Sequence, residues 1–278
     1  MDIHDKTKVI IEALPYLEKY HDKIVVIKLG GKILTDMKHV VNDISLLKHI
    51  GMKPIVIHGG GPVIDKELIK QNIKPKFING LRYTDKDTMK VVKNVFEKIN
   101  ENLVSGIKKH KAIASNVKKC IKVKQKNKKL GFVGEVVGID KDKILSLLEL
   151  DHIPIISPLG FDEKGDFFNI NADTVAAHVA IELKAEKLTI LTNVKGIQIN
   201  NKLQSHVDFK TAEKEIESGI INKGMIPKVA ACIYAVKNKC PKAHLINGLV
   251  PHSLLLEIFT DKGIGTEIVY ENGHKTDN

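Results

Sequence analysis

Apolar runs alternate along the chain with segments whose apolar residues recur at every third or fourth position. The runs are continuous and rich in Val and Ile, as in strands that are buried on both faces. They lie at Ile24–Leu29, 55–58, Ile153–Ile156, 188–191 and 244–246. Helical spacing is found at 62–71, 87–110, 173–183 and 227–239. This alternation predicts an α/β fold, a three-layer α/β/α sandwich with a mostly parallel central sheet.

Nothing along the chain has the composition of a flexible linker, so residues 1–278 are expected to form a single domain. Segment 160–169 is rich in turn residues and predicts a hairpin between two lobes. The boundary expected there divides the chain into an amino-terminal lobe, residues 1–165, and a carboxyl-terminal lobe, residues 166–278.

The residues before the first strand predict an amphipathic helix. Val9, Ile10, Ile11, Leu14 and Leu17 follow helical spacing. The sandwich has no obvious place for a helix ahead of its first strand, so this apolar stripe needs a partner. The helix either packs on its own subunit or contacts a second copy of the chain.

Glycine clusters follow the first two strands, at positions 30–31 and 59–61, and Pro62 then suits the first turn of a helix. Residues without Cβ let several backbone N–H groups converge on one anion. Ligands of parallel sheets bind at the carboxyl ends of the strands, where both clusters fall. Phosphate binding is therefore expected. Tight turns alone are the alternative, although three consecutive glycines are costly in chain entropy.

No nucleic-acid partner is expected, despite the formal net charge of +11. Lysines are spread along the chain, and the dense run at 118–129 has no aromatic residue to stack on bases. A single arginine, Arg82, occurs among the 44 Lys and Arg residues. Its guanidinium offers a rigid fork for a carboxylate or phosphate that Lys cannot copy. Arg82 is therefore expected to bind an anion, with a surface salt bridge as the alternative.

Several classes of protein are excluded by motifs that the sequence lacks. There is no apolar run of about 18 residues and no apolar leader, so no membrane partner and a cytoplasmic location are expected. Three cysteines without a C-x-x-C pair indicate buried thiols, with a disulfide or a zinc site as the alternative. The chain has no P-loop motif. It also lacks the G-x-S-x-G elbow that the loop at 58–61 would require in a lipase or esterase.

Together these motifs resemble the amino-acid kinase family, and within it the acetylglutamate kinases. The similar segments follow the family order over nearly the whole chain: 13–16, 26–31, 56–62, 80–85, 130–136, 169–173, 224–228, 252–257 and 263–266. The glycine motifs are shared by several amino-acid kinases. Gly-Leu-Arg at 80–82 and Asn-x-Asn-Ala-Asp at 169–173 point to the acetylglutamate branch.

The resemblance implies phosphorylation of the γ-carboxylate of N-acetyl-L-glutamate by Mg-ATP, the second step of arginine biosynthesis. Lys28 and Lys228 would neutralise the transferring phosphoryl group, and Asp173 would hold both ammonium groups without acting as a base. The implied substrate-binding residues are Gly59, Gly60, Gly61, Arg82 and Asn169, with Arg82 on the α-carboxylate. The implied nucleotide-binding residues are Lys28, Gly30, Gly31, Thr192, Asn193 and Lys228. Mg²⁺ would be carried mainly by ATP, without a metal site on the protein.

Two alternatives stay open. A related carboxylate kinase, such as one acting on an aminoadipate derivative, would share these motifs. A catalytically weak regulatory binding protein would also share them, but the intact Lys28, Asp173 and Lys228 argue against it. The chain departs from the family pattern at Asn193, where Asp is usual, at 112–119, and at Leu249, where Arg is often found.

The resemblance also implies regulation. In the arginine-sensitive branch, the amino-terminal helix interlaces dimers into a hexamer and L-arginine binds beside that helix. The matching effector positions are Tyr16, His244, Glu257 and Gly263. A homohexamer inhibited by L-arginine is therefore expected, with Glu257 paired to the guanidinium of the effector.

Overall fold

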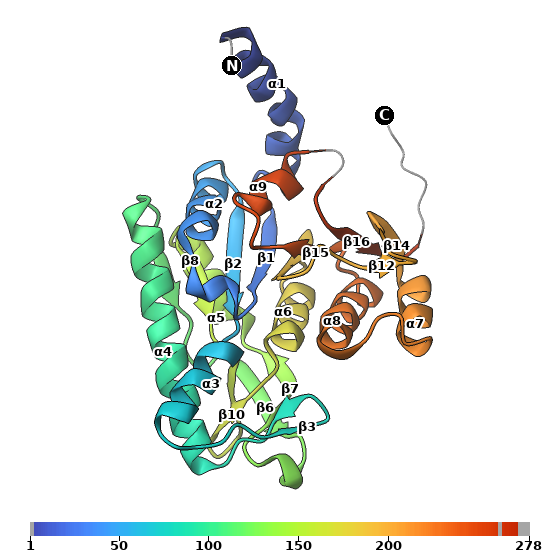
Figure 1. The fold of residues 1–278 in the computed structure, drawn as a ribbon. Helices are drawn as coiled ribbons and strands as arrows, with labels where there is room; N and C mark the ends of the chain where they lie inside the picture. Colours follow the sequence, from blue (N-terminus) through green and yellow to red (C-terminus); the bar gives the residue numbers. More distant parts are fainter. Residues whose placement is uncertain (1–2, 261–262, 272–278) are drawn as a thin grey trace.

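The computed structural model describes residues 3–260 and 263–271, which build an α/β/α sandwich around one large sheet (Figure 1). The sheet has the strand order β14-β16-β15-β11-β1-β2-β8-β5. Its strands are β1 (Ile24–Leu29), β2 (Lys53–His58), β5 (Ala114–Asn116), β8 (Ile153–Ile156), β11 (Lys187–Thr192), β14 (His206–Asp208), β15 (Lys242–Asn247) and β16 (Thr266–Val269). Only β15 and β16 pair antiparallel in this described sheet. The predicted mostly parallel sheet is confirmed.

The two faces of the sheet are covered by different helices. Val25, Ile27 and Leu29 pack into one apolar cluster, and Val26 into the other. The first face is covered by α2 (Lys38–His49), α3 (Gly61–Lys70), α4 (Lys86–Lys109) and α9 (Ser253–Ile258). The second is covered by α5 (Lys141–Glu149), α6 (Ala172–Glu182), α7 (Phe209–Glu217) and α8 (Ile226–Lys237). Because side chains alternate along a strand, Lys28 shares the face of Val26 and points towards α6.

A smaller sheet lies beyond the carboxyl ends of the central strands. Its order is β10-β9-β6-β7, formed by β6 (Ile121–Gln125), β7 (Gly134–Ile139), β9 (Leu159–Phe161) and β10 (Phe167–Asn169). Strands β9 and β10 form the hairpin predicted within 160–169. Two further hairpins are β3 (Phe77–Ile78) with β4 (Leu81–Arg82), and β12 (Gln198–Ile199) with β13 (Lys202–Leu203). Short 3₁₀ turns occur at η1 (Ile33–Thr35), η2 (Lys128–Leu130) and η3 (Lys223–Met225).

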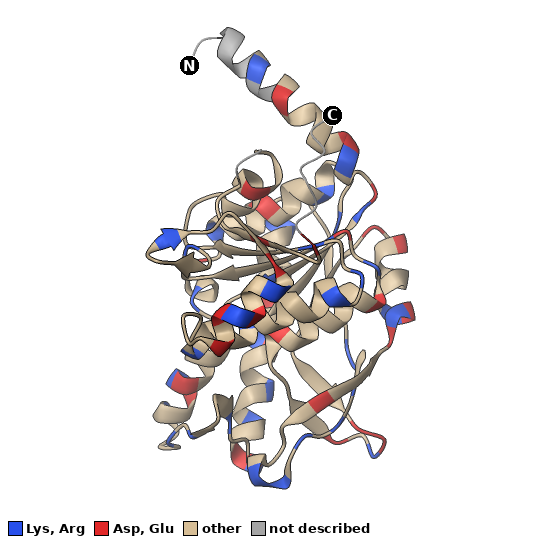
Figure 2. Ribbon diagram, turned by 90° about the vertical axis from the view of Figure 1, so that its right-hand side faces the viewer, with Lys and Arg blue, Asp and Glu red and all other residues tan. Residues whose placement is uncertain are grey.

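Helix α1 (Ile3–Tyr20) projects away from the rest of the molecule (Figures 1 and 2). Its last residue, Tyr20, is buried in the apolar cluster beside α2. Further out, Ile11 and Leu14 are 58% and 45% exposed. The side chains of Val9 and Ile10 are not among those that the structure describes. The predicted amino-terminal helix is confirmed, and the described part of its apolar stripe is left largely uncovered.

The thiols of Cys120, Cys232 and Cys240 are buried, as expected. Burial raises the pKa of Cys120 to about 12 and that of Cys240 to about 11. Lys and Arg residues are distributed over the helices and strands rather than gathered on one element (Figure 2). None of the described helices is long and apolar enough to cross a membrane.

Candidate active site

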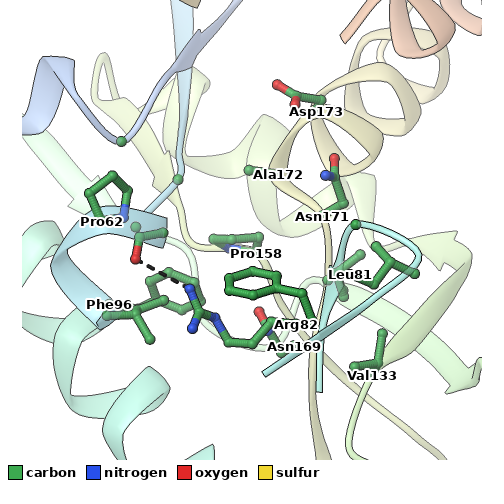
Figure 3. Close-up of a pocket in the computed structure, with 18 of the residues that line it drawn as sticks. Pro62, Leu81, Arg82, Phe96, Val133, Pro158, Asn169, Asn171, Ala172 and Asp173 are labelled. Carbon is green, nitrogen blue, oxygen red and sulfur yellow. Dashed lines mark hydrogen bonds between the residues drawn. The ribbon is translucent and has the colours of Figure 1, made fainter. Parts of the chain in front are cut away.

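A cavity of about 270 Å³ opens at the carboxyl ends of β1 and β2 (Figure 3). The glycine loops after these strands form one wall, and the β3–β4 hairpin forms another. The amino end of α6 and the start of α8 close the side that contains Asp173 and Lys228. The pocket therefore lies where the parallel strands end, as the sequence predicted.

Asp173 links two lysines at the top of this pocket. Its Oδ1 lies 2.7 Å from the ammonium of Lys28, and its Oδ2 lies 2.9 Å from that of Lys228. The second contact is an aligned hydrogen bond, whereas the first is an ion pair without ideal alignment. Lys28 comes from β1, Asp173 from the first turn of α6, and Lys228 from the first turn of α8. Residues far apart in sequence thus form one cluster with a net positive charge.

Burial makes the protonation states of this cluster interdependent. Lys28 and Asp173 are only 4% and 3% exposed. Burial opposes the ionisation of Asp173, but the charges of Lys28 and Lys228 outweigh it and hold the pKa of this carboxyl below its ordinary value. Burial lowers the pKa of Lys28, while Asp173 opposes that shift. The amino end of α6 further favours a carboxylate at this position.

The two glycine loops pack tightly against each other. A Cβ on Gly31 would lie 2.4 Å from Pro62, and a Cβ on Gly60 would lie 2.7 Å from the ring of Phe96. These glycines allow a close approach that any larger residue would block. Gly61 differs, because it lines the pocket and a Cβ there would meet no atom within 4 Å.

Two of the five glycines differ from the expectation that their amides face a ligand. The amide of Gly30 donates to Leu191 O at 3.1 Å, and that of Gly59 donates to Leu29 O at 2.9 Å. Both bonds tie the loops to neighbouring strand ends, and Gly30 does not line the cavity. Gly31, Gly59, Gly60 and Gly61 do line it.

Arg82 lies in the wall of the pocket and is 8% exposed. Its Nη1 donates to Asp65 at 2.6 Å. Its Nη2 donates to the Gly61 carbonyl at 3.3 Å (Figure 3). The guanidinium carbon lies 4.8 Å from the centre of the Phe77 ring. The lone arginine of the sequence is therefore fixed beside the glycine loop and is not at an exposed surface salt bridge.

Asn169 lies near Arg82 in the same pocket, below Asn171 and Asp173 (Figure 3). Its amide nitrogen donates to Thr84 Oγ1 at 3.3 Å. Asn171 caps α6 by accepting a hydrogen bond from the Thr174 amide at 3.0 Å. Sequence reasoning missed Asn171, although Asn two residues before Asp173 is a recognisable helix cap in the sequence.

Thr192 and Asn193 follow β11 at the same sheet edge but do not line the cavity. Thr192 is buried and its carbonyl accepts the Gly248 amide at 2.8 Å, whereas Asn193 is exposed. The divergent segment at 112–119 contains β5, the edge strand beside β8.

Three of the four predicted effector residues meet in a second cluster, centred on α9. Glu257 contacts His244 Nδ1, lies 3.5 Å from the ammonium of Lys187, and accepts the Ile264 amide at 3.0 Å. Burial opposes ionisation of Glu257, but His244 and Lys187 lower its pKa to about 2. Gly263 lies against the same carboxylate, where an added Cβ would be 2.8 Å from Oε2.

The fourth effector residue, Tyr16, is half-buried and packs against the apolar cluster that contains Tyr20. Lys187 was missed by sequence reasoning, because a lysine at the start of an apolar strand gives no sign of its distant partner Glu257.

Residues 23–247 match the amino acid kinase family, and the chain belongs to that family. Its curated relatives are more specific, since those at 39–46% identity are named acetylglutamate kinase. The relative from Thermoanaerobacter pseudethanolicus is 46% identical and aligns with 95% of this chain and 93% of its own. That from Methanocaldococcus jannaschii is 43% identical, with 96% and 97% covered.

Solved structures show the same fold. N-acetylglutamate synthase from Neisseria gonorrhoeae, complexed with coenzyme A and N-acetyl-glutamate, matches with a TM-score of 0.88 at 23% identity. The match covers 96% of this chain but only 64% of that chain. A Streptococcus mutans protein matches at 30% identity with a TM-score of 0.80, covering 89% and 99%. Carbamate kinase from Giardia lamblia bound to AMP-PNP matches at 16% identity with a TM-score of 0.67, covering 89% and 98%.

Proposed function

We propose that this chain transfers the γ-phosphoryl group of ATP to the γ-carboxylate of N-acetyl-L-glutamate, as the second step of arginine biosynthesis. The products are N-acetyl-L-glutamyl 5-phosphate and ADP. The observation that carries the proposal is the pair of contacts from Asp173, at 2.7 Å to Lys28 and 2.9 Å to Lys228. The names of the relatives support the choice of acceptor.

The chemistry needs positioning and charge neutralisation more than proton transfer. The attacking carboxylate is already ionised at neutral pH, so no general base is required. Lys28 and Lys228 would neutralise the charge that spreads over the transferring oxygens. Asp173 would hold the two ammonium groups apart and fix their orientation, because each contacts a different carboxylate oxygen of Asp173. Lys228, whose side chain is 19% exposed, is the more accessible of the two cations.

The amino-acid substrate would lie between Arg82 and the lysine pair. A guanidinium carries five N–H donors, so those not used by Asp65 and Gly61 remain for a substrate α-carboxylate. Asn169 on β10 would bind the same substrate through its side-chain amide. The amides of Gly60 and Gly61 would bind the γ-carboxylate, near the positive end of α3.

ATP would extend from Lys28, Gly31 and Lys228 past the carboxyl end of β11, where Thr192 and Asn193 lie. In this arrangement residues 1–165 bind most of the amino acid, with Asn169 added from the other lobe. Residues 166–278 bind most of the nucleotide, with Lys28 and Gly31 added from the first lobe. Asp173 is already engaged by two ammonium groups, so Mg²⁺ fits better on the oxygens of ATP than on the protein. The ion would neutralise phosphate charge when bound with the nucleotide.

Trapping of the acyl phosphate tests this function. Incubation with Mg-ATP, N-acetyl-L-glutamate and hydroxylamine should give the hydroxamate, and Lys228→Ala should lower its rate of formation through kcat. If the unaltered chain forms no hydroxamate, the proposed function is refuted.

We further propose that L-arginine binds near α9 and inhibits a hexameric form of the enzyme. The buried cluster of Glu257, His244 and Lys187 supports an effector site, because a guanidinium could replace the internal partners of the Glu257 carboxylate. The exposed Ile11 and Leu14 on α1 support contact with a second copy of the chain. Bound arginine would then change the position of α1 relative to α9, and this change would couple the effector cluster to the pocket.

A further inference from the structure

His58 is a buried histidine at the end of β2 that the reaction described above does not use. Its exposed fraction is 0%. Nδ1 lies 2.8 Å from the Gly59 carbonyl oxygen, and Nε2 lies 2.9 Å from Oδ1 of Asn100 on α4. The ring of Phe96 packs edge-on, with 5.5 Å between ring centres. The imidazole is therefore held on three sides directly beside the glycine loop.

The surroundings of His58 favour an uncharged imidazole. Burial lowers its pKa to about 4, and the positive charge of Lys28 acts in the same direction. Hydrogen bonds to Gly59 and Asn100 oppose the shift without reversing it. A second cation beside Lys28 would also add to the repulsion in a cluster that has only Asp173 as its anion.

A neutral imidazole has one donor and one acceptor nitrogen, and its partners determine which is which. The Gly59 carbonyl can only accept, so Nδ1 carries the hydrogen. Nε2 must then accept, and Asn100 has to present its NH₂ group rather than Oδ1. The two ends of an amide differ only by a 180° turn, and its orientation is assigned from its partners.

This hydrogen bond determines the direction of the next amide. The Gly59 carbonyl and the Gly60 N–H belong to one planar trans peptide and point in opposite directions. Gly59 is also fixed at its other end, because its amide donates to Leu29 O at 2.9 Å. With the carbonyl held by His58, the Gly60 N–H is directed away from His58, and Gly60 lines the pocket.

We infer that His58 is a positioning residue, whose neutral imidazole, oriented by Asn100, donates Nδ1–H to the Gly59 carbonyl and thereby aims the Gly60 amide at the anionic ligand of the pocket. The identity of that ligand, the γ-carboxylate of N-acetyl-L-glutamate, rests on the proposed function. The tautomer of His58 and the direction of the Gly60 amide are independent of the proposed function.

The tautomer is tested on the full chain by NMR with ¹⁵N-labelled histidine. The signals missing in His58→Asn identify His58. They should show a protonated Nδ1 and an unprotonated Nε2 that stay unchanged over roughly pH 5 to 8. An imidazolium, or a hydrogen on Nε2, would overturn the inference.

The positioning role is tested by two substitutions that place an amide differently. Asn at position 58 puts its NH₂ near the position of Nδ1, so His58→Asn should keep KM for N-acetyl-L-glutamate within about threefold. His58→Gln reaches the Nε2 position instead, and should raise that KM by about tenfold or more, with a smaller change in KM for ATP. His49→Gln is the control, because exposed His49 also contacts a carbonyl, His110 O at 2.9 Å, at the opposite end of the sheet.

The outcomes separate the two proposals. Equal KM values for the Asn and Gln variants, with melting temperatures like that of the unaltered chain, would refute the positioning role alone. If the unaltered chain forms no acyl phosphate, the proposed function fails, while the NMR result still decides the tautomer. If His58→Gln does not fold, His58→Asn alone decides. A KM for N-acetyl-L-glutamate that rises about tenfold in His58→Asn would contradict the inference.

Discussion

Arg82 and Asp65 form an ion pair in the wall of the pocket, with Nη1 of the arginine 2.6 Å from Oδ1 of the aspartate. Asp65 is on the first turns of α3, which follows the glycine loop, and Arg82 is on the β3–β4 hairpin. The pair therefore fixes the hairpin against the helix and sets the plane of the guanidinium before any substrate binds. Such preorganisation reduces the cost of ordering the site on binding.

Arg82→Lys keeps the charge but loses the fork, so it should chiefly raise KM for N-acetyl-L-glutamate. The expected loss is about 1.5–3 kcal/mol, the range for a hydrogen bond to a charged partner. Steady-state kinetics at saturating ATP measure it. Lys90→Arg, on the exposed face of α4, is the control. An unchanged KM in Arg82→Lys would mean that the guanidinium does not touch the substrate.

Gly61→Ala and Gly60→Ala should separate binding from folding. A methyl group added at position 61 would enter the pocket without touching protein atoms, so stability should be kept while KM for the amino acid rises about tenfold. A methyl group added at position 60 would press on Phe96, and should lower the free energy of unfolding by about 1–3 kcal/mol. Urea unfolding and KM are measured for both. A Gly61→Ala enzyme with normal KM would contradict substrate contact at this amide.

Glu257 should make stability depend on pH in the acidic range. Its pKa falls from an ordinary 4.5 to about 2 on folding, so its contribution is present above about pH 4.5 and is lost as the pH falls through about 2. Glu257→Gln should therefore lower the free energy of unfolding by roughly 3 kcal/mol at neutral pH. The difference in the free energy of unfolding between this variant and the unaltered chain should become smaller below about pH 4.5. Glu12→Gln is the control, because Glu12 is exposed. A difference in the free energy of unfolding for Glu257→Gln that does not change with pH would contradict the lowered pKa of Glu257.

Ile11→Asp with Leu14→Asp should break the assembly without unfolding the subunit, since both side chains are largely exposed. Light scattering should give a hexamer for the unaltered chain and a smaller species for the variant. The variant should also lose inhibition by L-arginine. Deletion of residues 1–14 should act in the same way, because it spares Tyr16 and the buried Tyr20. A variant that remains hexameric would exclude this part of α1 as the contact.

Much of the fold follows from local pattern. The continuous apolar runs gave the bounds of β1 and β8, and helical spacing predicted α4 to within a residue at each end. Other elements were missed. In β6, Ile121 and Val123 are buried while the lysines between and after them are exposed, an alternation that could have been recognised. The abundance of lysine in that segment hid it.

The site was less predictable than the fold. Parallel strands bring both glycine loops to one edge, which the sequence pattern allows one to infer. The partners of Arg82 and Lys187 depend on long-range packing that no local spacing encodes. Asp65 looks like any exposed helical acid in sequence, and Glu257 gives no sign that it contacts His244 and Lys187.

Acceptor selectivity distinguishes an acetylglutamate kinase from other carboxylate and carbamate kinases. The measurement is kcat/KM with Mg-ATP for N-acetyl-L-glutamate, L-glutamate, L-aspartate, carbamate and an N-acylated aminoadipate, under identical conditions. We expect kcat/KM for N-acetyl-L-glutamate to exceed that for each of the others by at least about tenfold, because Arg82, Asn169 and the glycine amides would bind both of its carboxylates. Equal or higher kcat/KM for any other acceptor would contradict it.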